Sequence, residues 1–198
     1  MKITLIVDVS ASMTDKAEES TEGIRGLVKD NPKAKYTLVE FGGTNDPVKV
    51  VFEGKTARKL TKYKLKPQSN TPMLDGIGKG LSLIDHDDKN LVIIVTDGEE
   101  NASHSWKIDQ LKPLIAANEA AGTEFIFLGA DVRSLEFADH VGIRTGRQFA
   151  FAANASGANA AYKVANVAAQ RMSSGSVFMD LDTHLDAEVS KTKDIKKK

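Results

Sequence analysis

The sequence predicts a doubly wound α/β domain, with a mostly parallel six-stranded sheet and helices on both faces. Short apolar runs rich in branched residues alternate with longer stretches of helical periodicity. In addition, the run LVIIVTDG shows no polar alternation, as expected for a strand that is covered on both faces. Because crossovers between parallel strands are right-handed, these elements favour the strand order 3-2-1-4-5-6.

Each predicted strand is a short apolar run bounded by charged or turn-forming residues. The predicted strands are Ile3–Val7, Tyr36–Phe41, Val48–Phe52, Leu91–Thr96, Glu124–Leu128 and Gln148–Ala152. The second and third are joined by GGTNDP, a segment dense in turn formers. This junction predicts a hairpin, and therefore one antiparallel edge strand on the otherwise parallel sheet.

The stretches between the strands have helical periodicity. The predicted helices are Asp15–Lys29, Met73–Ile84, Ile108–Ala121, Leu135–Val141 and Ala158–Met172. Gly122 follows an alanine-rich stretch and is typical of a helix stop. At 198 residues the chain is expected to form one domain over residues 1–175. Residues 176–198 are expected to be a C-terminal extension whose basic end is flexible.

The composition excludes several classes of protein. Lys plus Arg equals Asp plus Glu at 27 each, which gives no overall electrostatic case for a nucleic-acid or membrane partner. With no cysteine, disulfides, thiolate metal sites and cysteine nucleophiles are excluded. No apolar run is long enough to span a bilayer, and a first strand that starts at Lys2 leaves no room for a signal peptide. A cytoplasmic protein is expected.

Two carboxylates are predicted to meet at one edge of the sheet. Asp8 follows the first strand, in DVSASM, and Asp97 follows the fourth, in VTDG. In the expected strand order the winding direction reverses between these two strands, and ligands of such folds bind at the carboxyl ends of the strands at that reversal. The two acids therefore converge on the expected site.

Hydroxyl groups lie beside these acids. In D-x-S-x-S a turn after the strand can direct Asp8, Ser10 and Ser12 toward one point, and Thr71 lies just before a helix on the crossover into the fourth strand. Hard divalent ions take oxygen ligands, so the set predicts Mg²⁺, with Mn²⁺ or Ca²⁺ as alternatives. If the hydroxyls bind directly and the carboxylates hold waters, the ion's charge is under-compensated. Such an ion would attract a carboxylate from a partner, which suits binding better than turnover.

These motifs resemble the metal-ion-dependent adhesion site (MIDAS) of von Willebrand factor A (vWA) domains. DVSAS, the threonine of SNTP and the aspartate of VTDG match its three parts in order, and the likeness spans about residues 1–172. The segments TDGEENAS, EFIFLGAD and RQFAFAANASG are similar to those of small stand-alone vWA proteins from bacteria and phages.

The resemblance implies a Rossmann-like domain with the metal at its top. It implies that Ser10, Ser12 and Thr71 lie near the ion, with Asp8 and Asp97 acting largely through water. It also implies a protein partner that presents an Asp or Glu to the metal, within a larger assembly or beside an AAA+ ATPase, in the host cytoplasm or in the virion if a phage encodes the chain. No nucleotide-binding loop is present, so such an ATPase would be a separate chain.

Structural roles compete with metal binding for these residues. Ser12 with Asp15 forms a plausible capping box, and Thr71-Pro72 is typical of an N-cap followed by proline at the first helical position. Each pattern alone favours a cap, whereas the complete set with two strand-end carboxylates favours a metal site. Asp75 is expected in the first turn of its helix, where negative charge is favourable.

Candidate partner contacts flank the predicted site. Glu99, Glu100 and Asn101 follow the site aspartate, and Trp106 begins a helix near the rim. Polar residues of this kind also occur in any solvated loop, and packing in the core is the ordinary role of a tryptophan.

A basic segment, Lys55–Lys66, contains no acidic residue and precedes Thr71. Its lysines, Lys62 and Lys64 among them, could attract an acidic partner or a phosphate backbone, or they could protect the edge of the sheet from strand pairing. A nucleic-acid binder is disfavoured because the net charge is balanced and no aromatic residue other than Tyr63 is interleaved.

An enzyme of the haloacid-dehalogenase phosphatase type is a further alternative, because such enzymes also place an aspartate after the first strand beside Mg²⁺. Their chemistry needs a second acid two residues later to protonate the leaving group. This chain has Ser10 at that position. We therefore expect a binding protein with no catalytic residue.

Overall fold

The computed structural model describes residues 1–130, 132–152 and 154–175. Within these residues one sheet has six strands in the order β3-β2-β1-β4-β5-β6, as the sequence predicts. The strands are β1 (Lys2–Asp8), β2 (Lys35–Phe41), β3 (Val48–Thr56), β4 (Asn90–Thr96), β5 (Glu124–Gly129) and β6 (Gln148–Ala150). The β2–β3 pair is antiparallel and the other pairs are parallel. The predicted extension, residues 176–198, lies outside the described residues.

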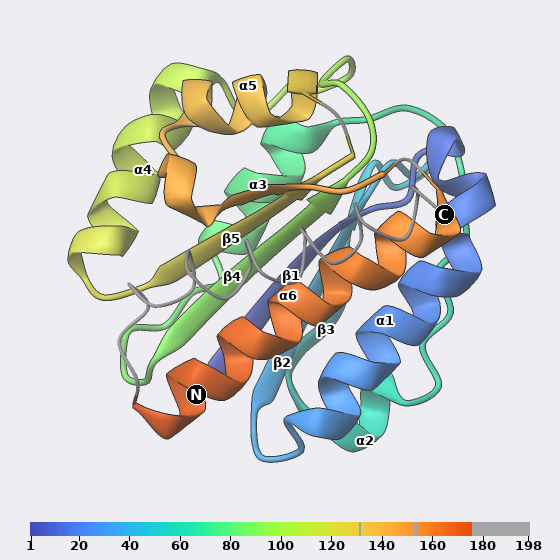
Figure 1. Ribbon diagram of the computed structural model, residues 1–198. Coiled ribbons are helices and arrows are strands. Elements are labelled where there is room, and N and C mark those ends of the chain that lie inside the picture. The colour runs from blue at the N-terminus through green and yellow to red at the C-terminus, as the bar shows by residue number, and fades with distance from the viewer. Residues whose placement is uncertain (131, 153, 176–198) are drawn as a thin grey trace, which may run out of the picture.

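Helices cover both faces of the sheet (Figure 1). They are η1 (Ala11–Lys16), α1 (Ala17–Asp30), α2 (Ala57–Leu60), α3 (Met73–Leu81), α4 (Ile108–Ala120), α5 (Val132–Val141), η2 (Thr145–Arg147) and α6 (Ala155–Ser174), where η denotes a 3₁₀ helix. In Figure 1, α1 and α6 lie side by side in front of the sheet, whereas α3, α4 and α5 lie on the other face.

The alternation of side chains along β1 divides the core in two. Ile3 and Leu5 pack with α1 and α6, whereas Ile6 packs with α3 and α4 on the opposite face. All three are fully buried, and β4 is buried along its whole length. Burial on both faces explains why these strands are continuous apolar runs rather than alternating ones.

The first helical segment differs from the expected helix at Asp15–Lys29. A 3₁₀ helix runs over Ala11–Lys16 before the α-helix begins at Ala17. Contacts distant in sequence shape this start, because Ala11 N donates to Ser69 O and Val9 N donates to Phe41 O. Gly42 has φ +123°, and an added Cβ there would lie 2.6 Å from Ser10 N. Only glycine fits that close approach.

Candidate metal site

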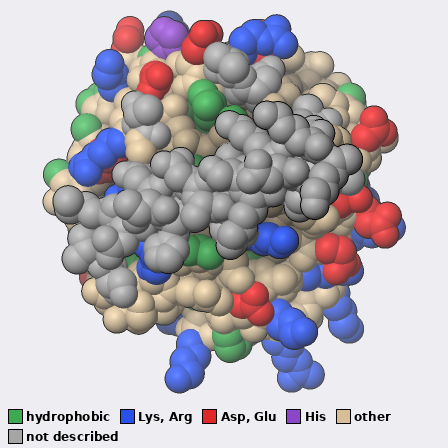
Figure 2. All heavy atoms as spheres, in the orientation of Figure 1, with side chains coloured by type: hydrophobic (Ala, Val, Ile, Leu, Met, Phe, Trp, Pro, Cys, Tyr) green, Lys and Arg blue, Asp and Glu red, His purple; other side chains and the backbone are tan. Residues whose placement is uncertain are grey.

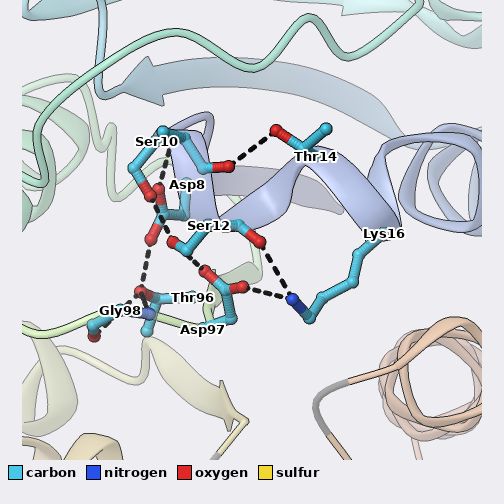
Figure 3. A network of polar contacts seen from close by, with 9 residues as sticks. Asp8, Ser10, Ser12, Thr14, Lys16, Thr96, Asp97 and Gly98 are labelled. Atoms are coloured by element: carbon cyan, nitrogen blue, oxygen red, sulfur yellow. Dashed lines mark hydrogen bonds and ion pairs between the residues drawn. The ribbon is translucent and has the colours of Figure 1, made fainter.

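The ends of β1 and β4 bring the motif residues together, as the sequence predicts. The two strands are parallel neighbours in register, with Val7 opposite Val95. Asp8 is the last residue of β1, and Asp97 directly follows β4. The two carboxylates therefore lie at the same end of neighbouring strands. Figure 3 shows Ser10 beside Asp8, and Ser12 between the Asp8 and Asp97 carboxylates.

Asp8 lies at the base of this cluster and is 0% exposed. It accepts hydrogen bonds from Ser10 N at 2.7 Å and from Thr96 Oγ1 at 2.6 Å. Burial raises the pKa of Asp8 to about 6, and the nearby charge of Asp97 acts in the same direction, whereas the hydrogen bonds from Ser10 and Thr96 lower the pKa. Among the described residues, no Lys, Arg or His forms an ion pair with Asp8. A buried carboxylate in these surroundings fits a bound cation.

The two serines extend from Asp8 toward Asp97. Ser10 Oγ and Ser12 Oγ are 2.9 Å apart, and Ser12 Oγ donates to Asp97 Oδ1 at 2.7 Å. Ser10 is buried and Ser12 is exposed, so the row of oxygens approaches the surface at Ser12. Ser12 does not have the capping role considered above, since no side-chain cap hydrogen bond occurs at the start of η1 or of α1.

Thr71 contributes a hydroxyl from a third segment of the chain, just before α3. A Cβ added at Gly98 would lie 3.2 Å from Thr71 Oγ1 and 3.5 Å from Asp8 Oδ2, so both oxygens border the same small space. Thr71 is not a helix cap, because α3 begins at Met73 without a side-chain cap hydrogen bond. Thr71 is a buried residue, and within the described part of the chain its Oγ1 forms no hydrogen bond, which leaves the hydroxyl available as a ligand.

The loop that follows β4 holds Thr71 in place. Asn101 Oδ1 accepts from Thr71 N at 2.9 Å, and Asn101 N donates to Thr71 O at 3.2 Å. Glu100 accepts from Leu74 N at 2.8 Å and also from backbone groups of its own loop. Glu100 and Asn101 therefore have internal hydrogen-bonding roles, which the sequence patterns did not indicate. Partner contact by either residue stays a prediction.

The other predicted contact residues are spread around the site. Glu99 is exposed and forms an ion pair with Arg133. Trp106 is half-buried, and an added Cβ at Gly78 would meet its ring, so the indole packs directly on α3. Lys62 and Lys64 are exposed, and neither forms an ion pair or a hydrogen bond with another described residue. Their role in partner binding also stays a prediction.

Three residues in or beside the cluster were not predicted from the sequence. Thr96 binds Asp8, Gly98 lines the space beside Thr71, and Lys16 Nζ lies 2.6 Å from Asp97 Oδ2. Position could have indicated the first two, because both flank Asp97 at the end of a buried strand. Lys16 gave no such signal, since a lysine at the end of a polar segment is ordinarily solvated.

The donor set fits a hard divalent cation. It combines two carboxylates with three hydroxyls, and oxygen ligands of this kind suit Mg²⁺, Mn²⁺ or Ca²⁺. No group of three or more His, Cys, Asp or Glu side chains able to hold a metal occurs in the described parts of the chain. A site here would therefore depend on the hydroxyls of Ser10, Ser12 and Thr71.

The fold and the cluster define a class of protein: a doubly wound α/β domain with an oxygen-rich site where the winding reverses. Residues 3–100 match the family model for the von Willebrand factor type A domain. No curated protein matches the chain. The matched segment contains all five residues of the candidate metal site, and together with the fold it supports a vWA domain protein.

Solved structures share this fold at low sequence identity. The pilus adhesin SpaC from Lactobacillus rhamnosus GG has a TM-score of 0.66 at 13% identity, over 85% of this chain and 30% of the adhesin. Proximal thread matrix protein 1 from the mussel byssus, with a zinc-occupied MIDAS motif, has 0.65 at 15%, over 85% and 45%. BatB from Bacteroides thetaiotaomicron has 0.62 at 15%, over 88% and 99%. The chain thus spans less than half of the first two proteins, and these likenesses show the fold alone.

Proposed function

We propose that this chain is a metal-dependent protein-binding module that uses a MIDAS to engage an acidic residue of a partner. Mg²⁺ is the proposed ion, held by Ser10, Ser12 and Thr71 with support from Asp8 and Asp97. One observation carries the proposal: these side chains converge from three separate segments, and the buried Asp8 has no basic partner among the described residues.

The arrangement favours binding over catalysis. A bound ion would supply a Lewis-acidic contact for an outside carboxylate. Ser12 is exposed, so that contact is approachable from solvent at Ser12. Asp8 is fully buried and its two oxygens accept hydrogen bonds, which is unsuitable for a nucleophile that must reach a phosphate. The phosphatase alternative therefore has no support from the geometry.

The nature of the surface agrees with a protein partner. Acidic and basic side chains are interspersed over the face seen in Figure 2 rather than gathered by sign. Every helix in the described ranges is too short or too polar to cross a membrane. We propose a protein partner, as part of a larger assembly or of a system with an AAA+ ATPase.

The test is capture of partners from the native host on the immobilised chain, in Mg²⁺ and in chelator, with the Asp8→Ala variant alongside. We expect proteins that bind the wild-type chain in Mg²⁺ and are released by chelator, and that Asp8→Ala fails to bind. Association that is equally strong in chelator would overturn the metal-dependent mode. Phosphate release from a generic aryl phosphate, lost in Asp8→Asn, would revive the phosphatase alternative.

A further inference from the structure

Lys16, at the end of η1, reaches into the candidate metal site. Its ammonium donates to Asp97 Oδ2 at 2.6 Å and to Ser12 O at 2.9 Å (Figure 3). The lysine side chain is 8% exposed and the Asp97 side chain is 2% exposed, so the ion pair is almost completely buried. A surface ion pair of this kind would contribute little to stability, whereas removing one partner of a buried pair is strongly destabilising because an uncompensated charge stays buried.

The position of this lysine is unusual for its residue type. Lysine is rarely buried unless it is paired, because removing an ammonium from water is costly. Here the ion pair joins the segment after β1 to the end of β4, the same two segments that supply Ser12 and Asp97. The site therefore contains a cation of its own, bound to one of the two carboxylates proposed to support the metal.

We propose that Lys16 is a built-in cation that sets the metal affinity of this site. The inference rests on the proposed metal-dependent function and concerns how the same site is regulated. Lys16 holds Asp97 and the Ser12 backbone in place when no metal is bound. Because the ammonium and a divalent ion repel each other and share Asp97, Lys16 also weakens metal binding.

The net charge of the metal-loaded site affects how strongly the site attracts an acidic partner. A divalent ion with two carboxylates alone would form a neutral site. With the Lys16 ammonium the loaded site keeps one net positive charge, which the carboxylate of a partner would neutralise. Lys16 thus lowers the affinity for the free ion and raises the attraction of the loaded site for an acidic group.

Titration calorimetry with Mg²⁺ and with Mn²⁺ tests the inference. Lys16→Met removes the charge and keeps most of the apolar stem, and Lys16→Gln keeps a donor for Asp97 without the charge. Lys33→Met is the matched control, because it removes one charge from an exposed lysine, just before β2, that has no ion pair with a described residue. We expect both Lys16 variants to bind the ions about ten-fold more tightly than wild type at low ionic strength, and Lys33→Met to stay within about two-fold.

Thermal unfolding in chelator gives a second readout. Lys16→Met leaves the buried Asp97 carboxylate without its ion-pair partner, so the melting temperature of this variant should fall below that of wild type and of Lys33→Met. Added Mg²⁺ should then raise the melting temperature of Lys16→Met more than that of wild type, because a ligand of the folded state stabilises it in proportion to its affinity. If Lys16→Met is too unstable to purify, Lys16→Gln serves in its place. Its melting temperature should also be below that of wild type in chelator and should also rise more on addition of Mg²⁺.

The outcomes separate this inference from the proposed function. If wild type binds the ions and the Lys16 variants bind no tighter, the inference is overturned and the metal site stands. If only the Lys16 variants bind, the metal-dependent function of the natural chain is overturned, and Lys16 has taken the place of the metal. If no variant binds either ion, both proposals are overturned.

Discussion

At the scale of single residues, Gly98 forms one wall of the candidate metal site. A Cβ there would crowd Thr71 Oγ1 at 3.2 Å and would be in ordinary van der Waals contact with Asp8 Oδ2 at 3.5 Å. Gly98→Ala would therefore occupy space that a coordinated ion needs, and we expect the affinity for Mg²⁺ to fall about ten-fold. Calorimetric titration of the variant measures the effect.

Gly26→Ala is the control for this change. Gly26 lies in α1, and an added Cβ there would meet no atom within 4 Å. The control should leave metal affinity unchanged and stabilise the fold by about 0.5–1 kcal/mol, because alanine is the better helix former. Equal affinities in Gly98→Ala and Gly26→Ala would show that the space beside Thr71 is not used by a metal.

Glu40 makes stability depend on pH without touching the metal site. Tyr63 OH donates to its carboxylate at 2.8 Å, and burial raises the pKa of Glu40, although the Tyr63 hydrogen bond and the charges of Lys49 and Lys66 lower it. Since the folded-state pKa lies above the unfolded value, the folded state binds the proton more tightly. The contribution of Glu40 to the free energy of unfolding is complete below the pKa that Glu40 has in the unfolded state. It is lost as the pH rises through the pKa that Glu40 has in the folded state.

Urea unfolding between about pH 4 and pH 7 measures this contribution. We expect the stability of wild type relative to Glu40→Gln to decline across that range, because the variant stays neutral. Glu53→Gln, at an exposed position of β3, should follow wild type. Parallel profiles for wild type and Glu40→Gln would contradict the assignment.

At the scale of elements, the loop after β4 is fastened to the start of α3. Asp75, in the first turn of α3, accepts from His104 N at 2.9 Å, from Ser105 N at 2.9 Å and from Trp106 N at 2.7 Å. Glu100 accepts from Leu74 N in the opposite direction. The helix and the loop thus satisfy each other's backbone donors, and the loop that holds Thr71 is fixed by the same contacts.

Asp75→Ala removes three accepted hydrogen bonds from this junction. Because bonds to a charged acceptor are stronger than neutral ones, we expect a loss of about 2–4 kcal/mol in the free energy of unfolding, measured by urea denaturation. Asp109→Ala is the matched control: it removes an exposed acid from the first turn of α4 and should cost under about 1 kcal/mol. Equal losses in the two variants would show that the junction contributes nothing beyond helix-end electrostatics.

At the scale of the whole molecule, the strand order of the sheet and the convergence of the motif residues could be predicted from local sequence patterns. Doubly buried strands such as β4 are continuous apolar runs, and their order follows from handed crossovers. Asp8 and Asp97 could be brought together because each ends such a strand. Family likeness then supplied the expected roles of Ser10, Ser12 and Thr71.

The features that could not be predicted from the sequence depend on contacts between segments that are distant along the chain. The 3₁₀ start of the first helical segment depends on Ser69 and on the close approach of Gly42. The inward turn of Lys16 depends on Asp97, 81 positions later in the chain. No periodicity or spacing within a segment reports such pairings, so the same polar residues can be solvated, structural or functional until the fold is known.

Metal binding by the hydroxyl set is the central claim, and Thr71→Val tests it most directly. The hydroxyl of Thr71 forms no hydrogen bond with a described residue, so its loss should leave the fold intact. Thr123→Val is the matched control, because Thr123 is also a buried threonine whose Oγ1 has no hydrogen-bond partner among the described residues. Titration calorimetry should show that wild type and Thr123→Val bind Mg²⁺ and that Thr71→Val binds at least about ten-fold more weakly. Unchanged affinity in Thr71→Val, or failure of wild type to bind Mg²⁺, Mn²⁺ and Ca²⁺, would contradict it.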